Sequence, residues 1–512
     1  MMSAAVRKPA GRDNKYDNFY AMANLERDFL QDYPDTLRRG LAEVASSSGV
    51  EIFVAGGVVR DFLLGRASLD LDLTVSSRAL ACAAEFARLT GGTFVPLDAD
   101  EDVARVVWQG YSIDFAVLRK GYQDIVSDLK DRDFTINALA VAFDRVGASL
   151  MSPYSIIDPL DGMNDIAGKC IRTTNDRVFA DDPLRLLRAY RFMATLNFMI
   201  DPATGRAIRE NRRLINSSSA ERINYELQKI MAADRPHLVI AGMADSGILF
   251  EIFPELQAGV GVEQPSSHHL DVYSHCQETL RHMTRVLEQP ETYYPGLGSE
   301  LEAYLARRSR RTLLHWAALF HDLGKPKTLE VRGEKKTFYN HDKEGGRIFI
   351  GMAERLRWGR NDTQLVAKLI EHHMRPFHLT NASRKTGITA RACLRLVRAV
   401  GDDLPGIFLL AMADSLAGQG PGKPAGTERS LAQLYLEVAA VYRNSIKPVF
   451  EEPPLLNGHD LQELFGLEPG PVFRKILTGL QEAQVEKKAC TREEALSWVA
   501  SYLEKNPAEK IH

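Results

Sequence analysis

The chain has 512 residues, with 64 Lys and Arg against 67 Asp and Glu, and a formal net charge of −3. Its 45% hydrophobic and 26% charged residues are ordinary for globular proteins and exclude collagen-like, coiled-coil and wholly disordered chains. The length predicts roughly three to five domains. The slightly negative net charge argues against a nucleic-acid partner, since nucleic-acid-binding proteins usually carry a net positive charge.

The cysteine pattern and the N-terminus predict a cytoplasmic protein. The five cysteines are scattered, with no C-x-x-C pair, which suits a reducing compartment better than a disulfide framework. Residues 1–24 are polar and lack the apolar core of a signal peptide, so we expect a disordered tail there. No stretch approaches the roughly 20 apolar residues of a membrane span, so no membrane association is predicted.

Residues 25–150 predict a mixed α/β domain with a small sheet. LDLDLTV at 69–75 alternates strictly between apolar and polar residues, which is typical of a strand, and we expect its leucines to face the core. The other expected elements, in chain order, are helix 25–48, strand 51–55, a short helix ended by Gly65, helix 79–89, and strands at 93–97, 104–109 and 112–118.

From about Asp181 onward the pattern is almost continuously helical, with long amphipathic runs at 183–196 and 221–233. Ten of the thirteen histidines lie between His268 and His378, which indicates a separate chemical unit. We therefore predict a helical region at 151–260, a histidine-rich domain at 261–420 and a C-terminal helical domain at 421–512.

Asp70 and Asp72 are two positions apart, so on a strand both carboxylates lie on one face. Two neighbouring carboxylates repel unless a cation lies between them, and Mg²⁺ prefers oxygen ligands. A solvated strand face is the alternative. A third acid is expected on a neighbouring strand, and Asp114 fits that position unless it is an ordinary edge carboxylate.

Gly56-Gly57 ends a predicted strand and opens a helix that carries Arg60, which suggests a backbone cradle for a triphosphate. The pattern is not G-x-G-x-x-G, so a dinucleotide fold is excluded. Phosphates beside paired aspartates indicate phosphoryl or nucleotidyl transfer with two metal ions.

Four segments then follow in order: GGVVRDFLLG with LDLDL, RDFTINALA at 132–140, DDPLRLLRAYRF at 181–192 and ERINYELQKIM at 221–231. Together they resemble the class II tRNA nucleotidyltransferase/poly(A) polymerase family. The resemblance implies an α+β head with a DNA polymerase beta-like sheet, followed by an all-α neck, body and further domain. It also implies Mg²⁺ at Asp70 and Asp72.

The same resemblance assigns nucleotide contacts. Arg132 and Asp133 would contact the ribose and phosphates, and Asp182 and Arg185 would read the base, with Arg188 beside them. At positions i and i+3 of a helix, Asp182 and Arg185 are neighbours that offer an acceptor and donors to cytosine or adenine. The alternative is that Asp182 caps the helix before Pro183.

Between Pro183 and Arg235 there are ten Lys and Arg against five Asp and Glu, which favours a track for an RNA backbone over a merely solvated face. The candidate RNA contacts are Arg209, Arg212, Arg213 and Arg222. The expected partners are tRNA, CTP and ATP. No obligate protein partner can be inferred.

The resemblance covers enzymes that add CCA, CC or A, and poly(A) polymerases. Only KGYQDIVSDLK at 120–130 separates the third acidic strand from Arg132, whereas full CCA-adding relatives carry a longer loop. This resembles the CC-adding branch, so we expect C addition, then full CCA addition. An A-adding enzyme or poly(A) polymerase is the next alternative.

A second series, HHLDVYSHCQETL, AALFHDLGKPKT, NHDKEGG, EHHMRP and MADSLAG, resembles the HD phosphohydrolase superfamily. Mixed His and Asp ligands suit a transition metal or Mg²⁺/Mn²⁺. The resemblance implies hydrolysis of a phosphomonoester or cyclic phosphodiester. It places first ligands at His275, His321, Asp322 and Asp414, a second ion at His341 with His372 or His373, and Lys325 against phosphate.

Two alternatives remain for the histidine-rich domain and for the whole chain. The HD residues could be a relic retained for folding. The chain as a whole could be a nucleotide-sensing regulator in which only the HD site is active.

Overall fold

The computed structural model describes residues 29–30, 33–143, 156–333 and 335–506, except for the side chains of 384–386. The described residues form two compact units. One runs to Ser219 and includes Ser246–Ile248; the other comprises Ala220–Asp245 and the residues from Leu249 onward. The expected tail at 1–24 lies outside the described residues.

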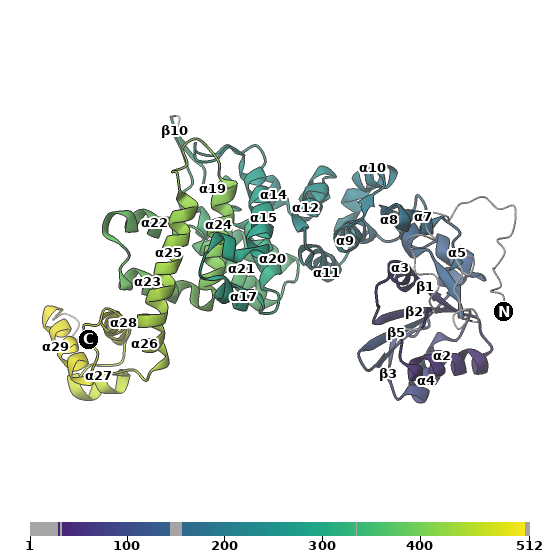
Figure 1. Ribbon diagram of the computed structural model, residues 1–512, viewed down its shortest axis with the longest axis horizontal. Coiled ribbons are helices and arrows are strands. Elements are labelled where there is room, and N and C mark those ends of the chain that lie inside the picture. The colour runs from purple at the N-terminus through teal and green to yellow at the C-terminus, as the bar shows by residue number, and fades with distance from the viewer. Residues whose placement is uncertain (1–28, 31–32, 144–155, 334, 507–512) are drawn as a thin grey trace, which may run out of the picture. The chain divides into compact units, whose positions relative to one another are not determined.

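The first unit is built on a seven-stranded sheet with strand order β3-β4-β5-β2-β1-β6-β7 (Figure 1). β2 and β5 pair in parallel, and the other neighbours are antiparallel. The strands are β1 (Ile52–Ala55), β2 (Asp70–Val75), β3 (Thr93–Asp98), β4 (Val103–Trp108), β5 (Tyr111–Val117), β6 (Ala140–Ala142) and β7 (Ile156–Ile157). The small mixed sheet confirms the α+β head.

Helices cover the apolar side of this sheet. α4 (Ala79–Thr90) packs on β4 and β5 and against α2 (Asp35–Ser48), and its buried Phe86 contacts Phe115 of β5 at a ring-centroid distance of 5.8 Å. α3 (Gly57–Leu63) follows β1 directly, and α5 (Ile125–Lys130) follows the 3₁₀ turn η1 (Arg119–Gly121) after β5.

Three sequence expectations about this unit need correction. Leu69 is 60% exposed because β2 begins only at Asp70, so only the later leucines of LDLDL face the core. The helix expected from 25 to 48 begins at Asp35, and 25–28 lies outside the described residues. The helix expected from Pro183 begins at Arg185, because residues 182–184 form a turn in which the Arg185 amide donates to the Asp182 carbonyl.

The rest of the first unit is mainly helical. Its helices are α7 (Gly162–Ala167), α8 (Val178–Asp181), α9 (Arg185–Leu196) and α10 (Pro202–Asn211), followed by the 3₁₀ turn η4 (Arg212–Ser217). A two-stranded parallel pair, β8 (Cys170–Ile171) with β9 (Met199–Ile200), was not predicted, since two-residue strands leave no alternation to detect.

The second unit is helical around α24 (Leu404–Ala417), which is buried on nearly all sides. Packed against it are α15 (Val272–Glu288), α18 (Arg310–Phe320) and α21 (Arg360–His372), and α21 packs on α20 (His341–Arg355). The unit also contains α11 (Ala220–Met231), α12 (Pro236–Asp245), α19 (Lys325–Thr328), α22 (Arg375–Thr386), α23 (Ala390–Val400) and α25 (Thr427–Val441).

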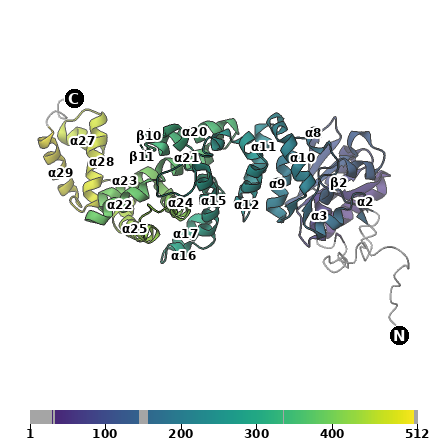
Figure 2. The ribbon, with the colours of Figure 1, turned by 90° about the horizontal axis from the view of Figure 1, so that it is seen from above.

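Two features at the edges of this unit complete the fold. β10 (Glu330–Arg332) and β11 (Lys335–Thr337), both labelled in Figure 2, form a hairpin that the almost continuously helical sequence pattern did not predict. The last helices, α27 (Gly458–Phe465), α28 (Pro471–Val485) and α29 (Arg492–Lys505), share an apolar cluster of their own around Leu461, Ile476 and Val499. No described helix is both long and apolar enough to cross a membrane.

Candidate active sites

The paired aspartates lie on β2 of the first unit. Leu71 and Leu73 are buried, so Asp70 and Asp72 face the opposite, open side of the sheet. β2 and β5 run in parallel with Asp72 directly opposite Asp114. Because side chains alternate along each strand, the three carboxylates share one face. The structure therefore brings together the three residues that the sequence singled out.

The electrostatics of Asp72 favour a bound cation. Its pKa is raised, first because surrounding protein displaces water from the carboxylate, and then because Asp114 and Asp70 add negative charge, against the opposing effect of Arg132. The side chain nevertheless keeps an exposed surface. An accessible carboxylate with further acids beside it suits a hard divalent cation such as Mg²⁺.

Arg105 is a neighbour of this site that the sequence reasoning missed. Its guanidinium donates two hydrogen bonds to Asp114, at 2.7 Å from Nε and 2.8 Å from Nη2, from the facing position on β4. Among the described residues, clusters of three potential ligand atoms within 4.8 Å of one another occur only in the second unit. In the head, Asp114 is engaged by Arg105 instead.

Gly56, which follows β1, lies close to the side chains of Arg132 and Asp72. It has φ 85°, and a Cβ there would lie 2.6 Å from Arg132 Nη1 and 3.6 Å from Asp72 Oδ2. Only glycine leaves that space to the Arg132 guanidinium. The Gly56 amide donates to the Leu139 carbonyl at 2.9 Å, and the nucleotide-binding role expected for Gly56 and Gly57 stays a prediction.

The two arginines near the glycines are turned inward. Arg132 is buried and donates to Asp128 and Thr74, each at 3.1 Å. Desolvation, followed by the neighbouring Arg119, lowers its pKa. Arg60 is also buried, and it pairs with Asp61 at 2.9 Å. The roles expected for both in nucleotide binding stay predictions, and here each makes protein contacts.

Asp133 and Arg188 bind one another. Arg188 donates from Nε at 2.8 Å and from Nη2 at 2.5 Å to the Asp133 carboxylate, which also accepts from Asn137. The pKa of Asp133 is lowered: burial opposes the shift, but Arg188 and the hydrogen bonds outweigh it. Arg188 extends from α9, so this pair attaches the helix after the candidate base-reading positions to the segment that begins at Arg132.

Asp182 and Arg185 lie at the junction of α8 and α9, and both are half-buried. Asp182 Oδ1 accepts the Leu184 amide at 3.2 Å. Arg185 donates to the backbone carbonyls of Asp131, at 3.3 Å, and Val178, at 3.4 Å. Asp182 thus accepts a local backbone hydrogen bond, similar to the helix-capping contact given above as the alternative to base reading. Arg185 instead reaches the backbone just before Arg132.

The candidate RNA contacts divide between the two units. Arg209 on α10 and Arg213 on η4 are exposed, and Arg212 packs against Gly247 and donates to the Arg209 carbonyl at 2.7 Å. Arg222 is exposed on α11 of the second unit. The basic segment thus offers exposed guanidinium groups in each unit.

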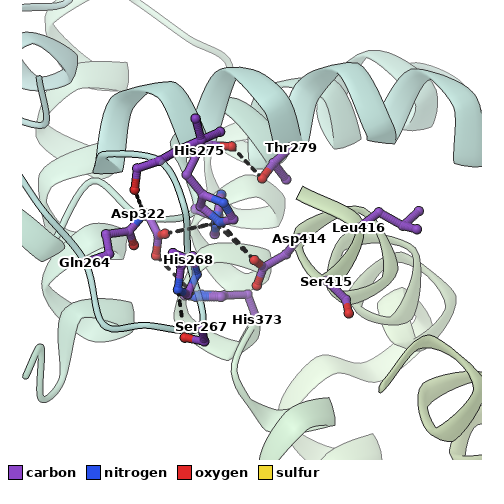
Figure 3. Close-up of polar contacts among 12 residues, drawn as sticks. Gln264, Ser267, His268, His275, Thr279, Asp322, His373, Asp414, Ser415 and Leu416 are labelled. Atoms are coloured by element: carbon purple, nitrogen blue, oxygen red, sulfur yellow. Dashed lines mark hydrogen bonds and ion pairs between the residues drawn. The ribbon is translucent and has the colours of Figure 1, made fainter. Parts of the chain in front are cut away.

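A second cluster lies in the helical unit, where ends of several helices converge (Figure 3). His275 extends from α15 and its Nε2 is 3.0 Å from Asp414 Oδ1 on α24 and 3.7 Å from Asp322 Oδ2. His321 and Asp322 directly follow α18, with His321 Nε2 3.1 Å from Asp322 Oδ2. The structure therefore brings together the four residues of the expected HD pattern.

His341 and His373 extend this cluster on the other side of Asp322. Their Nε2 atoms lie 3.5 and 3.7 Å from Asp322 Oδ1 and 3.3 Å from each other. Each Nδ1 faces a carbonyl, of Phe338 and Ile370 respectively, both at 2.7 Å, so each Nδ1 carries a proton. Two bare Nε2 acceptors that face one another and a carboxylate suit a bound cation.

The buried environment favours the metal-binding forms of His373 and Asp322. Burial, then the neighbouring His341, lowers the pKa of His373 to about 3, so this imidazole is neutral at physiological pH. The pKa of Asp322 lies well below its ordinary value: burial opposes ionisation, but His321 and Lys325 outweigh it. Lys325 Nζ is 2.6 Å from Asp322 Oδ2.

The structure distinguishes the members of the histidine pair and adds one residue. Among the described residues, His373 belongs to a potential metal cluster and His372 to none. His268, not predicted as a ligand, groups with His275 and Asp414. Burial, then Lys325, lowers its pKa to about 3. The sequence feature that could have identified His268 is the His268-His269 pair shortly before His275. This pair lies in a loop, where no periodic pattern indicates which way a side chain points.

The cluster opens into a pocket of about 610 Å³. Candidate ligands of the cluster line it. The β10–β11 hairpin and the turn after it supply Lys336, Phe338 and Tyr339, and Lys423 also lines the pocket. A pocket with a multi-histidine cluster and several lysines suits a phosphate ester.

Comparisons with known proteins agree with this arrangement. The sequence models of the poly(A) polymerase head domain, a probable RNA- and SrmB-binding site of polymerase A, and the HD domain match residues 52–172, 197–259 and 272–417. An A-adding tRNA nucleotidyltransferase from Deinococcus radiodurans is 30% identical over 463 residues, covering 89% of this chain and 96% of that protein. The chain belongs to the tRNA nucleotidyltransferase/poly(A) polymerase family. It is an enzyme.

Other relatives of the family carry different names. A CC-adding tRNA nucleotidyltransferase from Thermus thermophilus is 29% identical and covers 88% of this chain and 93% of its own length. A CC-adding enzyme from Geobacter sulfurreducens is 40% identical over 217 residues, 42% of this chain and 48% of its own. The family is therefore shown, while its members differ in the nucleotides that their names state.

Solved structures agree in fold. The CCA-adding enzyme of Thermotoga maritima complexed with tRNA matches with a TM-score of 0.60 at 22% identity, covering 93% of this chain and 97% of that one. An apo form of a CCA-adding enzyme gives a TM-score of 0.63 with the same coverage. These matches confirm the predicted succession of a mixed-sheet head and a helical remainder.

Proposed function

We propose that this enzyme adds C residues to the 3′ end of tRNA from CTP and stops before the terminal A. The observation that carries this proposal is the short connection between β5 and Arg132. It consists of η1 (Arg119–Gly121) and α5 (Ile125–Lys130) and is folded along its length. Asp124 caps α5 by accepting the Ser127 amide at 2.9 Å. This connection is shorter than the loop that the family resemblance associates with full CCA addition.

In this proposal the tRNA 3′-hydroxyl attacks the α-phosphorus of the nucleoside triphosphate, the new phosphodiester bond forms, and pyrophosphate leaves. Asp70, Asp72 and Asp114 would hold divalent cations, which supply charge neutralisation for the triphosphate. Asp182 and Arg185 would offer an acceptor and donors to the cytosine edge. The exposed Arg209, Arg213 and Arg222 would bind the tRNA backbone.

A specific observation favours a second candidate, the addition of A alone. The Deinococcus relative named as A-adding matches 89% of this chain at 30% identity, as much of it as the CC-adding Thermus relative, which matches 88% at 29% identity. The two candidates differ in which primer is extended and by which nucleotide.

The test uses full-length protein, labelled CTP or ATP, and tRNAs ending at the discriminator base, at C or at CC. Two C residues added to the shortest primer, with no A on any primer, would support the proposal. Addition of A to the CC primer alone would establish the second candidate. Long A tracts on arbitrary RNA would indicate a poly(A) polymerase, and no incorporation at all would favour a nucleotide-sensing regulator.

We also propose that the HD cluster hydrolyses a phosphomonoester or cyclic phosphodiester with one or two bound divalent cations. The facing Nε2 atoms of His341 and His373 support this, because their geometry leaves both lone pairs without a proton donor. Hydrolysis of RNA ending in a 2′,3′-cyclic phosphate is the test, with Mn²⁺, Mg²⁺ or a transition metal added in turn. Absence of turnover with all of them would make the cluster a folding relic.

A further inference from the structure

Lys120 holds an unusual backbone conformation at the start of the short connection. It is the middle residue of η1, with φ 51° and ψ 24°, in the left-handed region that glycine adopts without strain. The next residue is Gly121, also with positive φ. For a lysine this conformation carries a local strain cost, which contacts of its side chain can offset.

The side chain of Lys120 joins two acids that are far apart in sequence. Its Nζ lies 3.0 Å from Asp131 Oδ2 and 3.2 Å from Asp181 Oδ2. The lysine side chain is 56% exposed, whereas those of Asp131 and Asp181 are 14% and 26% exposed. Partial burial of both acids limits screening by salt. Lys120 therefore links the end of α5 to the end of α8.

Both acids are adjacent to the positions proposed to read the base. Asp181 directly precedes Asp182 in the chain. The carbonyl of Asp131 accepts the hydrogen bond from Arg185 Nη2 at 3.3 Å, while its carboxylate binds Lys120. A shift of Lys120 would therefore move Asp182 through Asp181, and Arg185 through Asp131.

We propose that Lys120 is a positioning residue that sets the orientation of Asp182 and Arg185, and thereby the discrimination between cytosine and adenine. This inference rests on the proposed base-reading function of that pair. Discrimination by hydrogen bonds depends on orientation, because these bonds weaken steeply as their angle departs from linearity. The short connection would contribute to nucleotide choice through this lysine, in addition to its length.

The test compares kcat/KM for CTP and ATP on whichever tRNA primer the wild-type enzyme extends. Lys120→Gly removes the side chain and suits the positive φ, so it keeps the fold, and Lys120→Met removes only the charge. Both should lower the discrimination ratio about fivefold, which corresponds to about 1 kcal/mol. Lys120→Arg should restore it, and Lys130→Ala, at an exposed lysine of α5, should leave it unchanged.

Asp181→Asn provides a second arm. If one network acts, the Lys120→Met/Asp181→Asn double variant should lose no more discrimination than Lys120→Met alone. An equal loss of rate with both nucleotides would reduce Lys120 to a structural residue and overturn the proposal. An unchanged ratio in the Lys120 variants, with a lowered ratio in Asp182→Ala, would overturn it while the base-reading function stands. An unchanged ratio in Asp182→Ala would overturn both.

Discussion

At the scale of single residues, Asp72 shows how a candidate catalytic position can work against stability. Its pKa is raised in the folded protein by desolvation and by Asp114 and Asp70. A carboxyl whose pKa is raised on folding stabilises the protein fully only below its unfolded pKa of about 3.9, and this contribution is lost as pH rises through the folded value. Folding therefore disfavours the ionised form of Asp72, and a bound cation would offset this cost.

Asp72→Asn should consequently have opposite effects on activity and stability. We expect nucleotide addition to fall by about a hundredfold or more, while the melting temperature in EDTA rises because the repulsion is removed. Labelled CTP or ATP incorporation and thermal unfolding at pH 7 measure the two effects. Asp100→Asn, an exposed acid in the turn after β3, is the control. Full activity in Asp72→Asn would exclude Asp72 from the catalytic site.

The adjacent histidines 372 and 373 offer a matched pair of variants. His373 is 1% exposed and faces Asp322, whereas His372 ends α21 half-buried and outside every potential metal cluster of the described residues. We expect His373→Asn to weaken Mn²⁺ binding by about tenfold or more and to abolish phosphohydrolysis, with nucleotide addition retained. His372→Asn should change neither. Calorimetric titration with Mn²⁺ measures the affinity of each variant. Equal affinities of the two variants would contradict the assignment of His373 as a metal ligand.

At the scale of elements, the turn after α18 approaches the start of α20 at one glycine. A Cβ on Gly324 would lie 2.0 Å from the His341 carbonyl oxygen, so Gly324→Ala must push the turn carrying His321 and Asp322 away from α20. We expect it to destabilise the protein by roughly 1–3 kcal/mol and to lower the HD activity.

Gly351 lies on α20 with open space at its Cβ position, so Gly351→Ala is the matched control. It should stabilise the protein by roughly 0.5–1 kcal/mol, because alanine favours the helix. Urea unfolding of each full-length variant provides the comparison. Equal stability of the two would show that the turn tolerates displacement from α20.

Periodic elements were predictable, and contacts between irregular segments were not. Alternation in 69–75 and 112–118 placed Asp72 and Asp114 on neighbouring strands, because period 2 determines the face. Arg105 was missed because its bond to Asp114 depends on the pairing register of β4 with β5. Which of His372 and His373 faces the metal cluster depends on the residue at which α21 ends, and the sequence pattern does not determine that residue. His268 lies in a loop, which has no periodic pattern.

At the scale of the whole molecule, the net charge conceals a basic segment and an acidic remainder of the chain. The chain carries −3, yet residues 183–235 contain ten Lys and Arg against five acids. The acids that outnumber the bases elsewhere include the carboxylates suited to hold cations. Average charge is therefore a poor guide to a nucleic-acid partner when the protein also binds metals, and the local excess is the relevant quantity.

This local excess should make the proposed tRNA binding measurably salt-dependent. Each phosphate contact adds about 0.7–0.9 to the slope of log affinity against log salt. Arg213→Ala, at an exposed position of η4, should lower that slope by about one contact and weaken all tRNA primers alike, without altering hydrolysis of a small substrate at the HD site. Lys505→Ala, at the exposed end of α29, should leave the slope unchanged. Filter binding at four salt concentrations measures both, and an unchanged slope in Arg213→Ala would place the RNA track elsewhere.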